Sequence, residues 1–486
     1  MEALANKLRK QRKDEKFFNK RSNVPKNADS TELYDKIKVL SPLLFNSEVS
    51  MEDKMKHILK ELDTNDCERL KLFLSFIRKL LCQKNPITKD LAIKLRYVDK
   101  FASLVNTTDS EALFEVLWSL SNLAAASEEA VEQIRAKGIQ YRIVELVDST
   151  NEEIKEHSLW VIANLIGENN EARNEIISTN LIEKLIDIMS LKAARKSLLE
   201  LVCWIISSLC KGSPLPSTER LKKLLKPLNN ILHVEDEVIL SDTMCAISYL
   251  TRSNEEAIKL VIEYITITRI TELLLHPNGL IKKSALIILG SICMGETKDI
   301  EHIINSGCLN NLSIIFQENI ECDILKYAAW VVSNIAADLK SHIGKIISSQ
   351  CLSRLICVVI NIPEVSIQKE VLYAITCCIL AANNDQLKQI QELKINEMLV
   401  TKLDTADTSI LLLVLEIIDK LLEAGDIGTL ENKYARNFHD IGGKYKLELL
   451  LTYSNEVINT RVLEILNKYY PYDDLPCDTN EMDVGY

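Results

Sequence analysis

Four tryptophans in the chain are each followed, four residues later, by a polar side chain. The pairs are Trp118 with Asn122, Trp160 with Asn164, Trp204 with Ser208, and Trp330 with Asn334. Residues i and i+4 of an α-helix lie on the same face, one turn apart. Asn is a weak helix former and is seldom buried. Three true Trp–Asn pairs at one spacing therefore indicate a binding surface better than they indicate packing alone.

A row of such pairs has the chemistry to hold an extended peptide with basic side chains. The Asn carboxamide carries a donor and an acceptor side by side, so it can bond both the N–H and the C=O of a peptide backbone. Neighbouring indoles would form slots for the aliphatic stems of Lys or Arg, with cation–π attraction adding to the apolar contact. Acidic side chains at the slot ends would select positive charge. The candidates are Glu168, Asp242 and Glu370, although each alone is more often a solvated surface charge.

The elements that must position these pairs repeat with a period of about 42 residues. Similar apolar segments are centred on one large or apolar residue, and successive centres are 42, 44, 41, 42, 43 and 43 residues apart. These centres are Trp118, Trp160, Trp204, Cys245, Ile287, Trp330 and Tyr373. Weaker copies at 69–81, 410–422 and 460–469 bring the number to about ten units.

This period, with two or three helices in each unit, is the armadillo/HEAT spacing. Each unit cannot bury its apolar face alone, so stacked neighbours would share one continuous core. We therefore expect an all-α fold, an armadillo-repeat right-handed superhelical solenoid of about ten repeats. The same expectation assigns most Leu, Ile and Val positions to the core.

Composition agrees with a helical chain and gives no sign of an enzyme. Gly and Pro together are 23 of 486 residues, under half of the roughly twelve per cent of average usage, which argues against a many-stranded or Gly-rich nucleotide fold. The sequence contains no Walker loop, His-Glu-x-x-His motif or nucleophile elbow. The cysteines lack zinc spacing and several lie in apolar helical runs, so we expect no metal, no cofactor and a reducing compartment. No membrane span is expected, because no uninterrupted apolar run is long enough.

Charge divides the chain into two opposed parts. The formal net charge of −11 argues against a nucleic-acid binder. Residues 1–26 nevertheless hold nine basic and three acidic residues, which leaves 49 basic and 66 acidic residues in the remainder. We expect a basic tail at 1–26, a linker at 27–49, the repeats at 50–470 and an acidic tail at 471–486. The basic residues that we single out in the first tail are Lys7, Arg9, Lys10, Arg12, Lys13, Lys20 and Arg21.

Together these features resemble the importin-α family, the adaptors that recognise nuclear localisation signals. Residues 8–15 and 19–25 are similar to the second half of the importin-β-binding domain of that family. The Trp–Asn pairs, the run at 242–250 and the region at 445–470 resemble family repeats in order. The resemblance implies a protein that shuttles between cytoplasm and nucleus. It also implies three partners: basic signal peptides of cargo, importin-β and a recycling export receptor that meets the last repeats.

The resemblance also assigns two peptide sites and a role for the tail. The major site would use Trp118, Asn122, Trp160, Asn164, Glu168, Trp204 and Ser208. The minor site would use Trp330, Asn334, Glu370 and Tyr373, with Asp242 as a further acidic residue. The basic tail would bind importin-β and, without that partner, fold back into the chain's own groove.

Several positions depart from the family pattern. Ser208, Ser291 and Cys377 stand where Asn is usual, Cys245 and Tyr373 where Trp is usual. A hydroxyl cannot replace the two-point carboxamide clamp. We therefore expect the major site to dominate and the minor site to be weak or altered. The basic segment that the family carries upstream of the tail motif is missing, so we expect weaker importin-β binding and leaky autoinhibition.

One other class of function fits the same sequence. A cytoplasmic armadillo scaffold of the catenin kind could carry a basic tail that touches anionic lipid or nucleic acid. A charge run of this length is also typical of a solvated, disordered arm. Binding to importin-β and to a basic signal peptide would distinguish the adaptor from the scaffold.

Overall fold

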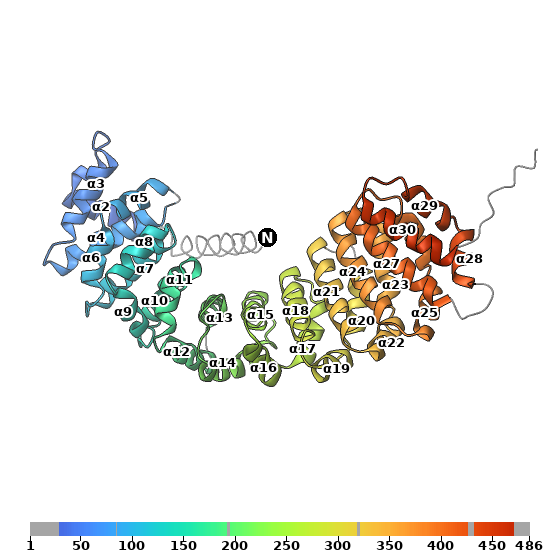
Figure 1. The fold of residues 1–486 in the computed structure, drawn as a ribbon. Helices are drawn as coiled ribbons and strands as arrows, with labels where there is room; N and C mark the ends of the chain where they lie inside the picture. Colours follow the sequence, from blue (N-terminus) through green and yellow to red (C-terminus); the bar gives the residue numbers. More distant parts are fainter. Residues whose placement is uncertain (1–28, 84, 192–194, 318–320, 426–431, 471–486) are drawn as a thin grey trace, which may run out of the picture. The chain divides into compact units, whose positions relative to one another are not determined.

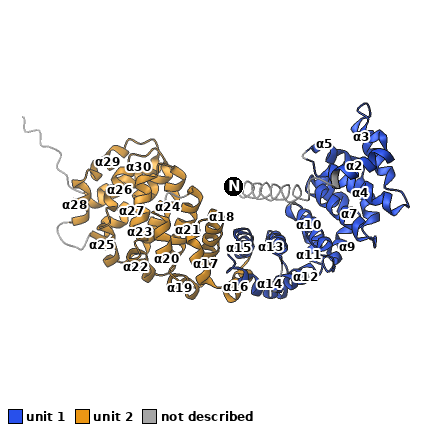
Figure 2. Cartoon of the chain, turned by 180° about the vertical axis from the view of Figure 1, so that it is seen from behind, with its two compact units in different colours: residues 1–253 blue, residues 254–486 orange. Residues whose placement is uncertain are grey.

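The computed structural model describes residues 29–83, 85–191, 195–317, 321–425 and 432–470. The predicted tails at 1–26 and 471–486 lie outside these described residues. The chain divides into two compact units, which meet in sequence between Ser253 and Asn254 (Figure 2). Secondary structure in the described residues is helical throughout, and no strand occurs among them.

The first unit contains fourteen α-helices and one 3-10 helix among its described residues (Figure 1). In chain order they are α2 (Asp29–Leu40), η1 (Pro42–Phe45), α3 (Met51–Glu61), α4 (Cys67–Leu81), α5 (Pro86–Lys94), α6 (Tyr97–Leu104), α7 (Ser110–Ala124), α8 (Glu128–Ala136), α9 (Ile139–Leu146), α10 (Glu152–Glu168), α11 (Asn170–Ile177), α12 (Leu181–Ser190), α13 (Lys196–Cys210), α14 (Thr218–Ile231) and α15 (Glu237–Thr251).

The second unit continues the same alternation of short and long helices (Figure 1). In chain order they are α16 (Glu255–Tyr264), α17 (Ile267–Glu272), η2 (Leu273–Leu275), α18 (Gly279–Ile292), α19 (Thr297–Asn305), α20 (Cys308–Ile315), α21 (Cys322–Asp338), α22 (Lys340–Ser348), α23 (Cys351–Asn361), α24 (Val365–Ala381), α25 (Asn384–Gln391), α26 (Ile395–Lys402), α27 (Thr408–Gly425), α28 (Lys433–Asp440), α29 (Gly443–Leu450) and α30 (Glu456–Tyr469).

The long helices stack side by side and form the core of each unit. In the first unit α4 packs against α7, α7 against α10, α10 against α13 and α13 against α15. In the second unit the same order runs α18, α21, α24, α27 and α30. We call these ten helices the ladder helices. Their number among the described residues and their spacing confirm the predicted all-α armadillo-repeat fold.

Asp or Asn side chains cap most of the ladder helices, whereas α13, α21 and α24 begin without a side-chain cap. The side chain of Asp109 accepts hydrogen bonds from the backbone N–H groups of Glu111 and Ala112 at the start of α7. Asn151 and Asp236 cap α10 and α15 in the same way. Such a cap satisfies backbone donors that the first helical turn leaves without partners. Where such a cap is present, a capping residue followed by an apolar run marks the start of a ladder helix.

A left-handed residue joins the two short helices in six of the repeats. Glycine fills this position three times, as Gly138, Gly307 and Gly442. The other three of these junctions are formed by Arg96, Gln350 and Lys394, with φ values of 57, 65 and 59°. Side chains with a Cβ pay a steric cost there that Gly avoids. The low Gly content is therefore explained in two ways. These repeats need only one left-handed turn each, and three of the six turns are made by residues other than Gly.

One repeat departs from this plan. Between α13 and α15 a single helix, α14, takes the place of the two short helices. Pro227 lies inside α14, near its C-terminal end. A proline there removes one helical hydrogen bond and disfavours a straight continuation.

The predicted linker at 27–49 is corrected by the structure. Helix α2 and the 3-10 helix η1 occupy most of it, and α2 packs against α4. Leu33 and Ile37 are buried there, and the Tyr34 ring meets the Phe76 ring edge to face at 5.6 Å. This segment was hard to recognise because it lacks the ladder spacing. Its apolar residues nevertheless cover a face of α4, the first ladder helix, that has no preceding ladder helix to pack against.

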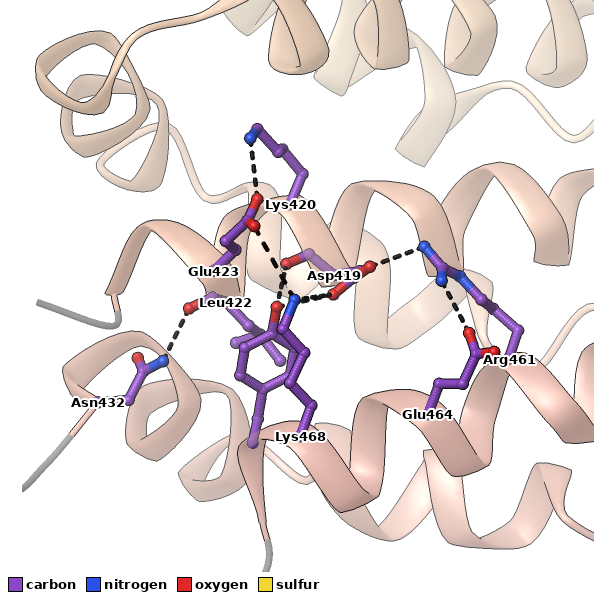
Figure 3. A network of polar contacts seen from close by, with 9 residues as sticks. Asp419, Lys420, Leu422, Glu423, Asn432, Arg461, Glu464 and Lys468 are labelled. Atoms are coloured by element: carbon purple, nitrogen blue, oxygen red, sulfur yellow. Dashed lines mark hydrogen bonds and ion pairs between the residues drawn. The ribbon is translucent and has the colours of Figure 1, made fainter. Parts of the chain in front are cut away.

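The last ladder helix is fastened to its neighbour by charged side chains (Figure 3). Asp419 of α27 accepts hydrogen bonds from Arg461, at 2.7 Å, and from the hydroxyl of Tyr469, at 2.7 Å, both on α30. Lys468 lies 3.4 Å from the same carboxylate. Burial raises the pKa of Asp419, but the Tyr469 hydroxyl and the two cations outweigh it and hold the pKa below its ordinary value.

Three further properties of the described residues bear on function. Each cysteine there lies outside any disulfide bond. No group of three His, Cys, Asp or Glu side chains in the described ranges is arranged to hold a metal ion. No single helix in this part of the chain has the length and apolarity to cross a membrane, and α22 with α23 passes that test only as a pair bent by 69°.

Candidate functional site

The structure places every predicted Trp–polar pair on a ladder helix. In the first unit, α7 carries Trp118 and Asn122, α10 carries Trp160 and Asn164, and α13 carries Trp204 and Ser208. We call these three pairs the first ladder. In the second unit, α21 carries Trp330 with Asn334 and α24 carries Tyr373 with Cys377. We call these two pairs the second ladder.

The asparagines also join neighbouring repeats. The amide nitrogen of Asn164 donates to the backbone oxygen of Ser121, at 3.0 Å, and to its hydroxyl, at 3.1 Å. Asn334 donates to the backbone oxygen of Gly290 at 3.0 Å. An amide nitrogen has two N–H donors and the amide oxygen two lone pairs. These half-buried amides therefore hold the preceding helix through their nitrogens, and their oxygens keep the capacity to accept a hydrogen bond from a peptide N–H.

The first pair of the first ladder is closed. Trp118 is only 7% exposed and Asn122 is fully buried. The Arg78 guanidinium lies 4.4 Å from the centre of the Trp118 ring, and the His157 ring lies 4.9 Å away. Phe114 meets the same indole edge to face at 5.3 Å. From the sequence we expect Trp118 and Asn122 to bind a peptide like the other pairs. In the structure, side chains of the chain itself surround Trp118 instead.

The next two indoles are half-buried and touch one another. The rings of Trp160 and Trp204 meet edge to face with their centroids 5.8 Å apart. That separation is within the range of a direct aromatic contact, so the expected slot between these two indoles is not open. An aliphatic stem would lie across their exposed parts, and Asn164 lies one turn from Trp160 on α10.

The second ladder is more irregular. The Trp330 ring lies on α18, where a Cβ at Gly290 would come within 2.2 Å of it. Tyr373 is 55% exposed, and the adjacent Cys377 thiol raises the pKa of its hydroxyl. Only one full indole–amide pair, Trp330 with Asn334, is therefore present here, as the sequence indicates.

The three acidic candidates lie in different environments. Glu370 is exposed on α24, beside Tyr373. Asp242 is buried on α15, in the first unit, and so lies in a different unit from the other minor-site residues. Glu168 is the last residue of α10, and its side chain lies outside the described residues.

Two acidic residues of the first ladder were missed from sequence. Glu156 and Glu200 are half-buried, and each precedes a ladder indole, Trp160 or Trp204, by four residues. Residues four apart share a helix face, so a search at that spacing before each Trp would have found them. Neither carboxylate makes an ion pair within 4 Å with another residue in the described ranges. They supply negative charge on the helix faces that carry the two half-buried indoles.

The chain is similar to curated proteins named importin subunit alpha, although no protein-family model matches it. Importin subunit alpha-1b of Oryza sativa subsp. japonica is 26% identical over 440 residues, which cover 88% of this chain and 82% of the relative. Importin subunit alpha-1a of the same organism is 29% identical over 280 residues, 57% of this chain; that match spans about half of the relative, 53%.

A solved structure shares the fold. The crystal structure of an engineered protein superimposes with a TM-score of 0.73 and covers 85% of this chain and 98% of its own. Its sequence identity to this chain is 19%, so the likeness concerns the fold alone.

Proposed function

We propose that the chain is a nuclear import adaptor that binds basic nuclear localisation signals of cargo proteins and links them to importin-β. The observation that carries the proposal is the row formed by Trp160, Asn164 and Trp204, with Glu156 and Glu200 on the same helices. Indoles, a carboxamide and carboxylates together suit the stem, backbone and charge of a Lys- or Arg-rich segment. Relatives named importin subunit alpha support the same reading.

The open part of the first ladder, Trp160 with Asn164 and Trp204 with Ser208, is the main site in this proposal. It holds two half-buried indoles, whereas the second ladder holds one, on α21. Ser291 and Cys377 occupy amide positions of the second unit, and neither side chain offers the paired donor and acceptor of Asn. We therefore infer that the second ladder binds basic peptides weakly and adds little to the affinity for a one-cluster signal.

The basic tail supplies the link to importin-β in this proposal. Lys7, Arg9, Lys10, Arg12 and Lys13 lie outside the described residues, so the support is their sequence and the similarity to importin-α relatives. In the absence of importin-β, Lys20 and Arg21 of the same tail compete for the first ladder, because they have the charge of a cargo signal. A protein with these two partners shuttles between cytoplasm and nucleus and meets an export receptor for its return.

The test is a binding experiment that separates an adaptor from a scaffold. The full chain is incubated with immobilised importin-β and, separately, with an immobilised Lys-rich signal peptide. We expect retention on both at physiological salt and loss of importin-β binding when residues 1–26 are deleted. A charge-scrambled peptide serves as control. Retention on neither bait, with binding to anionic vesicles instead, would identify the scaffold and overturn the proposal.

A further inference from the structure

One position of the ladder helices is small in every repeat from α7 to α24 and large in α4. It lies three residues after the central residue of each unit and is occupied by Ser121, Ala163, Ser207, Ser248, Gly290, Ser333 and Thr376. The caps of α4 and α7, Asp66 and Asp109, are 43 residues apart. At that offset the counterpart of Ser121 in α4 is Arg78.

Three of these small residues, Ser121, Ala163 and Gly290, precede a repeat whose centre is Trp, and a small side chain there leaves room for the indole on the preceding helix. Trp330 shows this contact most clearly, because a Cβ at Gly290 would come within 2.2 Å of its ring. Arg78 prevents the same arrangement in the first repeat. Its guanidinium lies between α4 and the Trp118 ring, 4.4 Å from the ring centre, and its side chain is 13% exposed.

The guanidinium is held in place by a carboxylate on the ladder helix that carries Trp118. Arg78 pairs through Nε with Glu115 of α7. The hydroxyl of Ser75 donates to the other oxygen of Glu115 at 2.5 Å. Glu115 is itself buried. A cation on an indole beside a carboxylate is the arrangement that the first ladder would offer to a basic ligand.

The remaining sides of Trp118 are covered as well. His157 of α10 lies 4.9 Å from the ring and Phe114 lies 5.3 Å away, whereas Trp160 and Trp204 remain half-buried. Asn122 donates to the sulfur of Cys82 at 3.3 Å. Its buried amide oxygen has no partner among the described residues. With Trp118 only 7% exposed and Asn122 fully buried, this pair is closed to a ligand from outside.

We propose that Arg78 is a specificity-determining residue that occupies the first indole of the ladder in place of a ligand cation. A bound peptide then makes its first indole contact at Trp160. The first unit has three indoles, but only two of them are left to bind basic side chains of the peptide. This inference rests on the proposed function. It also predicts that Arg78→Ser lets Trp118 settle on α4, exposes the indole and frees Glu115 to receive a further Lys or Arg.

The first experiment measures oligolysine binding to the full chain by calorimetry. Trp118→Phe, which keeps an aromatic ring in the packed position, should leave the Kd of wild type within about twofold, whereas Trp160→Phe should weaken it about tenfold. In the Arg78→Ser background, Trp118→Phe should become as costly as Trp160→Phe. An equal loss from the two substitutions in the wild-type chain would overturn the inference.

The second experiment needs no ligand and so stands apart from the proposed function. Acrylamide quenching of Trp fluorescence should increase in Arg78→Ser relative to wild type, whereas Arg78→Ser should add no quenching when it is made in a Trp118→Phe chain. The matched control is Lys71→Ser, because Lys71 also joins α4 to α7, through Glu111 at 3.1 Å, and makes no contact with Trp118. Unchanged quenching in Arg78→Ser would contradict the inference that Arg78 covers the Trp118 ring. Absence of oligolysine binding in all variants, with the quenching result intact, would instead count against the proposed function.

Discussion

At the scale of single residues, the ladder side chains pack neighbouring repeats together, and in the proposed function the same side chains bind a peptide. The spacing of Trp and Asn predicts a shared helix face, and the structure has each pair on one helix. The sequence could not show that Asn164 and Asn334 also bond the preceding helix, because their partners lie 43 and 44 residues earlier in the chain. Nor could it show that Trp118 is enclosed, since Arg78 reaches it only after the repeats stack.

Gly290 gives a residue-scale prediction. Gly290→Ala places a Cβ where the Trp330 ring lies, so the ring and the neighbouring Asn334 must move. We expect a loss of about 1–3 kcal/mol in the free energy of unfolding, as for overpacked cores, and a shift in Trp emission. The measurement is chemical denaturation followed by fluorescence.

Gly167→Ala is the matched control for this change. Gly167 is also on a ladder helix, α10, and a Cβ there would meet nothing within 4 Å. Alanine favours the helix over glycine, so the control should be neutral or slightly stabilising. Equal losses in both variants would mean that the cost at Gly290 does not come from the indole.

At the scale of elements, the chain is a series of capped ladder helices joined by short helices. The period of about 42 residues and the helical pattern could be read from sequence, because the apolar runs and their central residues recur. The helix at 29–40 was not predicted as part of the fold, since it lacks a ladder centre. The merged helix α14 was also not predicted, because Pro227 normally argues against a continuous helix.

Asp419 gives an element-scale prediction on the contact between α27 and α30. Its carboxylate is 20% exposed and takes bonds from Arg461 and Tyr469. Asp419→Asn removes the charge from this contact and should cost about 2 kcal/mol at neutral pH. Hydrogen exchange of the α30 amides should therefore rise. The control is Asp385→Asn, whose ion pair with Lys388 is exposed and should contribute little.

The same group gives the pH dependence of this contact. The pKa of Asp419 is below its ordinary value in the folded chain, so its stabilisation is complete above the unfolded pKa, about 3.9. It is lost as the pH falls through the lowered value. The stability difference between wild type and Asp419→Asn should therefore be constant near neutrality and shrink below about pH 4. A difference that grows on acidification would contradict this assignment.

At the scale of the whole molecule, a basic tail and an acidic repeat region belong to one chain. The net charge of −11 conceals this division, which the sequence shows at once. Each unit contributes a ladder, and the first has the more complete chemistry for a basic peptide. The fold class could be predicted almost entirely from periodicity. The accessible part of the site could not, because exposure depends on which side chains the stacked repeats bring over each indole.

The central claim is that basic peptides bind the first ladder at Trp160 and Asn164. Calorimetric titration of a Lys-rich signal peptide into the full chain, with and without Trp160→Ala plus Asn164→Ala, tests it most directly. The account predicts a salt-dependent complex for the wild type and loss of measurable binding for the double variant, with Trp330→Ala plus Asn334→Ala changing the affinity little. Unchanged affinity in the Trp160 and Asn164 variant would contradict the account.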